Sequence, residues 1–218
     1  MSGSNCCDPE RVFLFLRKPD GSFAPRREVR FKLPGIGPAE RDLMRGTTRP
    51  HLLDWDRDGH TDLVIGHMAS WTLHVSTGPL AGKAEVEVKP FALPAVPDGN
   101  PYHFAFADWD GDGQLDLLTA VQNLEPKDRR WNYGVYWFRN TSAAGEPKFA
   151  AGSRLLTIPP PWELDAFAVA DWGQDGRSHL VVSMSKNWRR RMEGPVENQL
   201  WLYRRKAEPS AAADPGRR

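Results

Sequence analysis

Short apolar runs separated by turn-forming residues recur along the whole chain, which indicates strands rather than helices. Some runs alternate large and small apolar residues, as at 104–107 and 167–170, and others are continuous, as at 63–65. Runs of roughly four to six residues bounded by Gly, Pro, Asn and Asp are typical of an all-β protein. The chain contains 19 Gly and 19 Pro residues, which favours frequent turns and disfavours long helices.

A repeat organises these runs. Three segments align without gaps, and they start at Asp54, Asp108 and Asp171 with the sequences DWDRDGHTDLVIG, DWDGDGQLDLLTA and DWGQDGRSHLVVS. A further short apolar strand follows each segment, at 71–75, 135–138 and 200–203. Units of about four antiparallel strands that recur every 40–65 residues or so predict β-propeller blades. A two-layer β-sandwich is the competing architecture.

The repeat region is expected to span residues 1–206, with three Asp-loop units and a partial leading blade. The run at 12–16 belongs to that leading blade, which has no Asp-rich loop before it. Residues 207–218 are rich in Ala, Pro and charge and predict a disordered polar tail. Propellers usually close with about four to eight blades. The chain is therefore expected to be part of a larger protein, to assemble with other blades, or to form an open arc with unprotected edges.

Two of the three loops have the ligand spacing of a calcium site. In D-x-D-x-D-G-x-x-D, positions 1, 3, 5 and 9 point carboxylates inward, position 7 offers its carbonyl, and Gly at position 6 permits the turn. The predicted metal ligands are Asp54, Asp56, Asp58, His60 and Asp62 in the first loop, and Asp108, Asp110, Asp112, Gln114 and Asp116 in the second. Carboxylates this close repel one another without a cation, so about two bound Ca²⁺ ions are predicted. The alternative is a set of Asx turns without metal.

The third loop departs from this pattern. It keeps Asp171 and Asp175, but position 3 is Gly173 and position 9 is His179, which predicts a weak or lost metal loop. None of the loops is an EF-hand, because that loop needs a Glu at position 12, where the first loop has Ile65, and because no helical pattern follows.

At these residues the chain resembles the FG-GAP/VCBS repeat family, which includes the propellers of integrin α-subunits and many bacterial secreted or surface proteins. The resemblance rests on the Asp loops, on Leu-Val-Ile-Gly at 63–66 and on Tyr-Trp-Phe-Arg-Asn at 136–140. It implies a propeller with calcium in the turn between the first two strands of a blade. It also implies a binding or adhesion role outside the cell, at the cell surface or in the periplasm. No signal peptide is visible, and no apolar run is long enough to span a membrane.

Two long connections, 121–133 and 186–198, are expected on the face opposite the calcium loops. They carry aromatic and guanidinium groups, which suit sugars, carboxylates or phosphates. The candidate ligand-binding residues are Arg129, Arg130, Trp131, Trp188, Arg189 and Arg190. We expect a carbohydrate, protein or anionic ligand on this face. The alternative is a pair of solvated loops whose Trp side chains pack on neighbouring strands.

Other functions receive less support. The net charge of +1 gives no reason to expect nucleic acid. The remaining acids and the six His residues form no catalytic signature, so no catalytic activity is expected. A propeller-based carbohydrate lyase or hydrolase is the alternative.

A structural role within a larger propeller is the third possibility. Trp55, Trp109 and Trp172 share position 2 of the three loops, which predicts packing between blades. Cys6 and Cys7 are adjacent, so they provide no disulfide framework.

Overall fold

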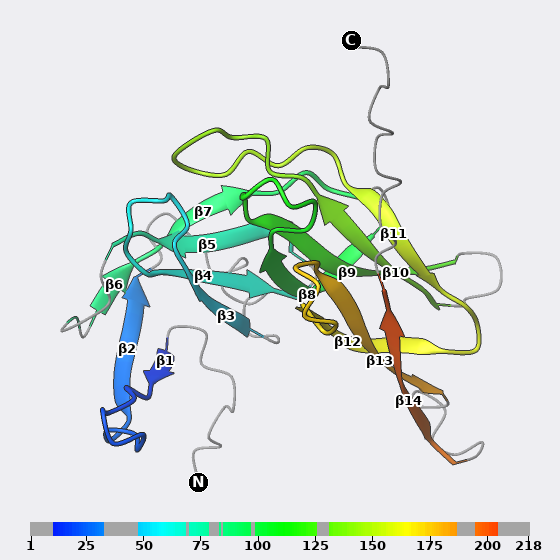
Figure 1. The fold of residues 1–218 in the computed structure, drawn as a ribbon, viewed down its shortest axis with the longest axis horizontal. Coiled ribbons are helices and arrows are strands. Elements are labelled where there is room, and N and C mark those ends of the chain that lie inside the picture. Colours follow the sequence, from blue (N-terminus) through cyan, green and yellow to red (C-terminus); the bar gives the residue numbers. More distant parts are fainter. Residues whose placement is uncertain are drawn as a thin grey trace, which may run out of the picture.

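The computed structural model describes residues 11–32, 48–68, 70–78, 83, 85–96, 99–125, 131–186 and 195–204. Within these residues every regular element is a strand, and fourteen strands form four small sheets. The sheets follow one another around an open arc, with the first and the last at opposite ends (Figure 1). The all-β prediction is therefore confirmed. The chain segments at 1–10 and 205–218, which include Cys6, Cys7 and the predicted tail, lie outside the described residues.

The two central sheets each have four antiparallel strands that are paired in chain order. The second sheet of the arc consists of β3 (Thr48–Leu53), β4 (Asp62–His67), β5 (Thr72–Ser76) and β7 (Lys89–Ala92). The third consists of β8 (Asn100–Ala107), β9 (Asp116–Leu124), β10 (Trp131–Phe138) and β11 (Ser153–Ile158). This up-and-down connectivity is that of a propeller blade, and it agrees with the predicted number of strands per unit.

The two outer sheets have three strands each. The last sheet consists of β12 (Glu163–Ala170), β13 (His179–Lys186) and β14 (Glu197–Tyr203). The first consists of β1 (Arg11–Leu14), β2 (Arg27–Lys32) and β6 (Glu85–Glu87), and β6 runs parallel to β2. Since β6 continues through Val88 into β7, one extended segment forms an edge of two neighbouring sheets. The Val88 amide donates to the Lys32 carbonyl at 3.0 Å, which joins the first sheet to the second.

At the ends of the sheets that lie away from the Asp loops, the strands are longer than predicted. Residue Trp131 of β10 pairs with Leu124 of β9, and Lys186 of β13 pairs with Glu197 of β14. The prediction of long connections at 121–133 and 186–198 is therefore wrong in its bounds, because the first ladder covers 121–124 and 131–133 and the second covers Lys186 and 197–198. The amino-acid composition at the end of a hairpin does not reveal how far its cross-strand hydrogen bonds continue, so the sequence does not predict where these strands end.

Two of the three position-2 tryptophans pack between sheets, as predicted. Trp55 is 2% exposed and lies edge-on to Phe91 of its own sheet and Phe106 of the next, with ring centroids 5.0 and 5.9 Å apart. Trp109 is 8% exposed and belongs to a cluster that includes Phe167 of the last sheet. Trp172 is 62% exposed, which contradicts the prediction at this position. It lies in the loop between β12 and β13. These strands belong to the last sheet of the arc, beyond which the described part of the chain places no further sheet (Figure 1).

This difference predicts unequal effects of the same substitution at equivalent positions. Trp109→Ala should lower the free energy of unfolding by about 3–5 kcal/mol, because it leaves a cavity between two sheets. Trp172→Ala should change it by less than about 0.5 kcal/mol, as is usual for exposed side chains. Urea denaturation of both variants measures the two values. Equal losses would show that Trp172 is also covered in solution.

Candidate metal centre

Each Asp loop connects the first two strands of its sheet. The loops occupy residues 54–61 between β3 and β4, 108–115 between β8 and β9, and 171–178 between β12 and β13. Position 6 has a positive φ in all three, at Gly59 (85°), Gly113 (83°) and Gly176 (76°), as the spacing predicts. The backbone at position 4 is also left-handed in all three loops. Only the second loop has a glycine there, Gly111, whereas Arg57 (φ 61°) and Gln174 (φ 51°) adopt this conformation in the other two. Sequence reasoning did not find this second turn.

The side chain at position 1 organises the backbone of every loop. One of its carboxylate oxygens accepts a hydrogen bond from the amide of the position-6 glycine, and the pairs are Asp54–Gly59 (3.0 Å), Asp108–Gly113 (2.9 Å) and Asp171–Gly176 (3.0 Å). The position-5 carboxylate accepts from the amide two residues later in each loop, with distances of 2.8, 2.9 and 3.1 Å. Asx turns therefore exist in all three copies, including the degenerate one. In the first loop they use one oxygen of Asp54, whereas in the second and third loops both oxygens of Asp108 and Asp171 accept loop amides.

The oxygens left over in the first loop fit a hard cation. Carboxylate oxygens of Asp54, Asp56 and Asp58 lie within 4.8 Å of one another. Asp54 Oδ1 and Asp56 Oδ1 are buried and have no hydrogen-bond partner among the described residues. Burial raises the pKa of Asp56, and the neighbouring carboxylates raise it further, Asp58 most strongly. Unpaired buried anionic oxygens are costly unless a cation neutralises them, and six to eight oxygens at short distance are what Ca²⁺ prefers.

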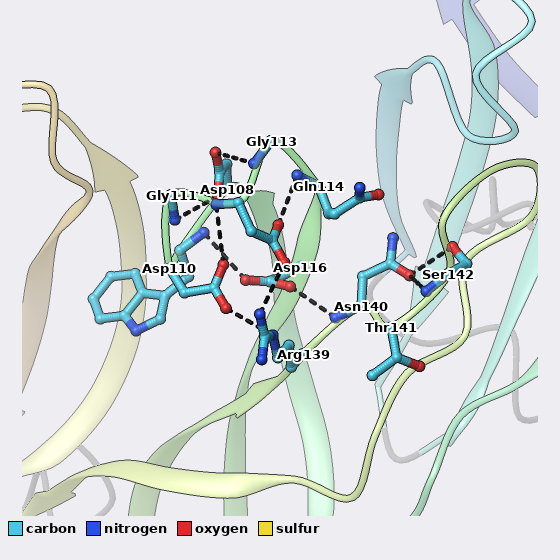
Figure 2. Close-up of polar contacts among 12 residues, drawn as sticks. Asp108, Asp110, Gly111, Gly113, Gln114, Asp116, Arg139, Asn140, Thr141 and Ser142 are labelled. Carbon is cyan, nitrogen blue, oxygen red and sulfur yellow. Dashed lines mark hydrogen bonds and ion pairs between the residues drawn. The ribbon is translucent and has the colours of Figure 1, made fainter.

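The position-9 carboxylates lie deeper than the others. Asp62 is fully buried, and its two oxygens accept hydrogen bonds from the amides of Trp55 and Gly78, both at 2.7 Å. Asp116 is also fully buried and accepts from the amides of Trp109 at 3.2 Å and Asn140 at 2.7 Å (Figure 2). Burial is the main cause that raises the pKa of Asp116. These predicted ligands thus also join the loop to the end of the third strand, a role that the spacing did not reveal.

Position 7 has its predicted place in the turn. The amides of His60 and Gln114 donate to the position-5 carboxylates in the hydrogen bonds given above. Their carbonyls remain the predicted ligands. In the second loop the side chain of Gln114 also has a buried Oε1 without a partner among the described residues.

The third loop brings together a different set of potential metal ligands. Oxygens of Asp171 and Asp175 lie within 4.8 Å of a ring nitrogen of His179. His179 is 2% exposed, and its Nδ1 lies 2.9 Å from the Arg177 carbonyl oxygen. Because a carbonyl oxygen only accepts, Nδ1 carries the proton in this hydrogen bond. The imidazole therefore bonds within the loop. The expectation of a weak or lost site remains a prediction.

Sequence reasoning missed one residue of the second loop. Arg139, at the end of β10, places Nε 2.7 Å from Asp110 Oδ2 and Nη2 3.1 Å from Asp112 Oδ2 (Figure 2). The two carboxylates raise the pKa of Arg139, that of Asp112 most strongly. The signal was present in the Tyr-Trp-Phe-Arg-Asn segment, but its partners are 27 and more residues away in the chain.

A hollow of about 390 Å³ opens at the ends of β9 and β10 that point away from the Asp loops. Its lining includes Asn123 and Asn132, which pair across the two strands, and Tyr136, whose hydroxyl accepts a hydrogen bond of 2.7 Å from Arg154 Nε. Of the predicted ligand residues, half-buried Trp131 begins β10. The others, Arg129, Arg130, Trp188, Arg189 and Arg190, lie outside the described residues.

The fold and the loops define an all-β protein built from blade-like sheets with an acidic loop between the first two strands. A family model described as an FG-GAP-like repeat matches residues 54–119, from the start of the first loop to β9. The chain therefore carries an FG-GAP-like repeat, and the predicted resemblance is confirmed over these residues. No curated protein matches the chain in sequence. Among the described residues no helix is long and apolar enough to cross a membrane.

The position-9 contacts predict that this carboxylate stabilises the protein even without metal. In the presence of a chelator, Asp62→Ala should lower the free energy of unfolding by about 2–4 kcal/mol, because it leaves two amides without their acceptor. Asp58→Ala is the matched control, since that side chain is 47% exposed and accepts from one exposed amide. Its effect should stay near or below about 1 kcal/mol. Chemical denaturation monitored by Trp fluorescence compares the two variants, and equal effects would contradict the structural role of position 9.

Proposed function

We propose that this chain is a calcium-stabilised β-propeller binding module without catalytic activity of its own. The observation that carries the proposal is the pair of buried, unpartnered oxygens of Asp54 and Asp56 in a loop of an FG-GAP-like repeat. Bound calcium would neutralise the crowded carboxylates, and the ligands would be the side chains at positions 1, 3, 5 and 9 with the carbonyl at position 7.

The loops lie where neighbouring sheets meet, which is why their rigidity matters. From the first loop, Arg57 Nη1 donates to the Ala143 carbonyl at 3.1 Å, in the β10–β11 connection of the next sheet. From the third loop, Ser178 Oγ donates to the Asp108 carbonyl of the second loop at 3.0 Å. Each of these bonds crosses from one sheet to its neighbour. A cation that fixes a loop therefore also supports the contact between two blades.

The ligand face is proposed to be the one opposite the Asp loops. The hollow there is lined by Asn123 and Asn132, which carry side-chain amides, and by Arg154. Amide and guanidinium groups beside an aromatic ring suit a carbohydrate, a protein segment or an anionic group. We place the module outside the cell, as is typical of FG-GAP repeats. Further blades, from a longer chain or from another subunit, are proposed to cover the sheet that carries exposed Trp172.

Calcium binding is tested directly on chelator-treated protein. Calorimetry should find about two sites with dissociation constants of about 10⁻⁴–10⁻³ M, as in extracellular modules. At a calcium concentration about 100-fold above such a constant, each site should add about 2.7 kcal/mol to the free energy of unfolding. The double variant Asp56→Ala with Asp110→Ala should lose both effects. Asp20→Ala removes an exposed acid outside the loops and should lose neither. A melting temperature that calcium does not change would refute the proposal.

The ligand face is tested by binding to a glycan array. Asn132→Ala and Arg154→Ala should each weaken the signal by tenfold or more, because a lost charged or paired hydrogen bond costs about 1.5–3 kcal/mol. Trp131→Ala and Trp188→Ala report on the predicted aromatic contacts. Arg177→Gln, in the third Asp loop, is the control and should bind like the original chain. Binding that only the control weakens would place the ligand on the calcium side instead.

A further inference from the structure

The first two Asp loops have the same ligand spacing but differ in what their carboxylates contact. In the first loop, Asp54 Oδ1 and Asp56 Oδ1 have no partner among the described residues. In the second loop, the equivalent Oδ1 atoms of Asp108 and Asp110 accept from the amides of Gly111 at 2.7 Å and Asp112 at 3.3 Å. The clear difference is at position 1, where the first loop has an unpaired anionic oxygen and the second has a satisfied one.

Within the described part of the chain, an arginine pairs with the loop carboxylates in the second loop only. The Arg139 guanidinium spans two of the three clustered carboxylates, with Asp110 at 2.7 Å and Asp112 at 3.1 Å (Figure 2). Two charged hydrogen bonds to two different carboxylates are strong and specific. The Asp110 side chain is only 16% exposed, so its contact with Arg139 is partly shielded from water.

The position of Arg139 is fixed by its neighbour in the chain. The Asn140 amide donates to Asp116 Oδ1, which holds the end of β10 against the base of the loop. The equivalent contact of the first loop comes from the Gly78 amide to Asp62 Oδ1. The residue before Gly78 is Thr77, which occupies the place of Arg139 and carries no charge.

We propose that Arg139 is an internal counter-ion that makes the two calcium loops unequal. The inference rests on the proposed function. The first loop takes up calcium first, because among the described residues its carboxylates pair with no arginine or lysine, and only the His60 ring lies near them, 3.7 Å from Asp58 Oδ1. The second loop binds calcium only at higher concentration, since the ion must displace the guanidinium or share two carboxylates with it. At low calcium the second loop remains neutralised by its own side chain.

Residue-resolved titration separates the two loops in the intact protein. The Gly59 and Gly113 amides each donate to the position-1 carboxylate of their loop, so their NMR signals report the loops individually. In the original chain, Gly113 should respond at a calcium concentration about tenfold higher than Gly59, the size expected from one nearby like charge. In Arg139→Gln the Gly113 midpoint should fall by about that factor, and the Gly59 midpoint should not change.

Two further variants keep this test decisive. Arg204→Gln removes the same charge at the equivalent position after β14, and it should leave both midpoints unchanged. Thr77→Arg should weaken binding at the first loop by about tenfold, and it decides the matter if Arg139→Gln does not fold. Equal midpoints in the original chain would overturn the inference, as would an unchanged or weakened second loop in Arg139→Gln. If neither glycine responds to calcium, the proposed function itself fails.

Discussion

A buried carboxylate with two backbone donors supports the rest of this architecture. Asp62 and Asp116 are fully buried, and each accepts one hydrogen bond from its own loop and one from the second residue after the third strand. Burial of a charge is tolerable only because both oxygens are bonded. The loop donor is the amide of the position-2 tryptophan. The same side chain therefore fixes the loop, ties it to its sheet and directs an indole into the neighbouring sheet.

The last sheet shows that the shape of the loop and the packing of its tryptophan depend on different residues. His179 replaces the buried carboxylate, and its imidazole bonds to the Arg177 carbonyl of its own loop. The loop keeps its shape, since Asp171 still accepts from the amides of Asp175 and Gly176, both at 3.0 Å. Loop shape thus depends on position 1. The packing of the tryptophan depends on a neighbouring sheet, which Trp172 lacks within the described residues.

The features that were predictable from the sequence are those that short spacings encode. The turn at Gly59 and Gly113, the strands around the loops and the burial of Trp55 and Trp109 all follow from a pattern repeated within about a dozen residues. The features that were missed join distant segments. Examples are the parallel pairing of β6 with β2, the contact of Asn140 with Asp116 and the ion pairs of Arg139. Such contacts depend on how distant strands are placed relative to one another in space, and the local pattern of residues does not reveal this.

The three loops share one backbone shape but differ in how the negative charge of their carboxylates is balanced. Their backbones are alike because the same Asx hydrogen bonds shape them, so the backbone does not determine whether a cation is needed. That need depends on the carboxylates that remain unpaired. Among the described residues, the first loop has three clustered acids that no arginine or lysine pairs with, the second has three acids with Arg139, and the third has two acids with His179. A family match identifies the shared backbone. The negative charge that a loop offers to a cation follows from the local balance of charge, and a side chain at the end of the third strand changes that balance while the loop keeps its backbone.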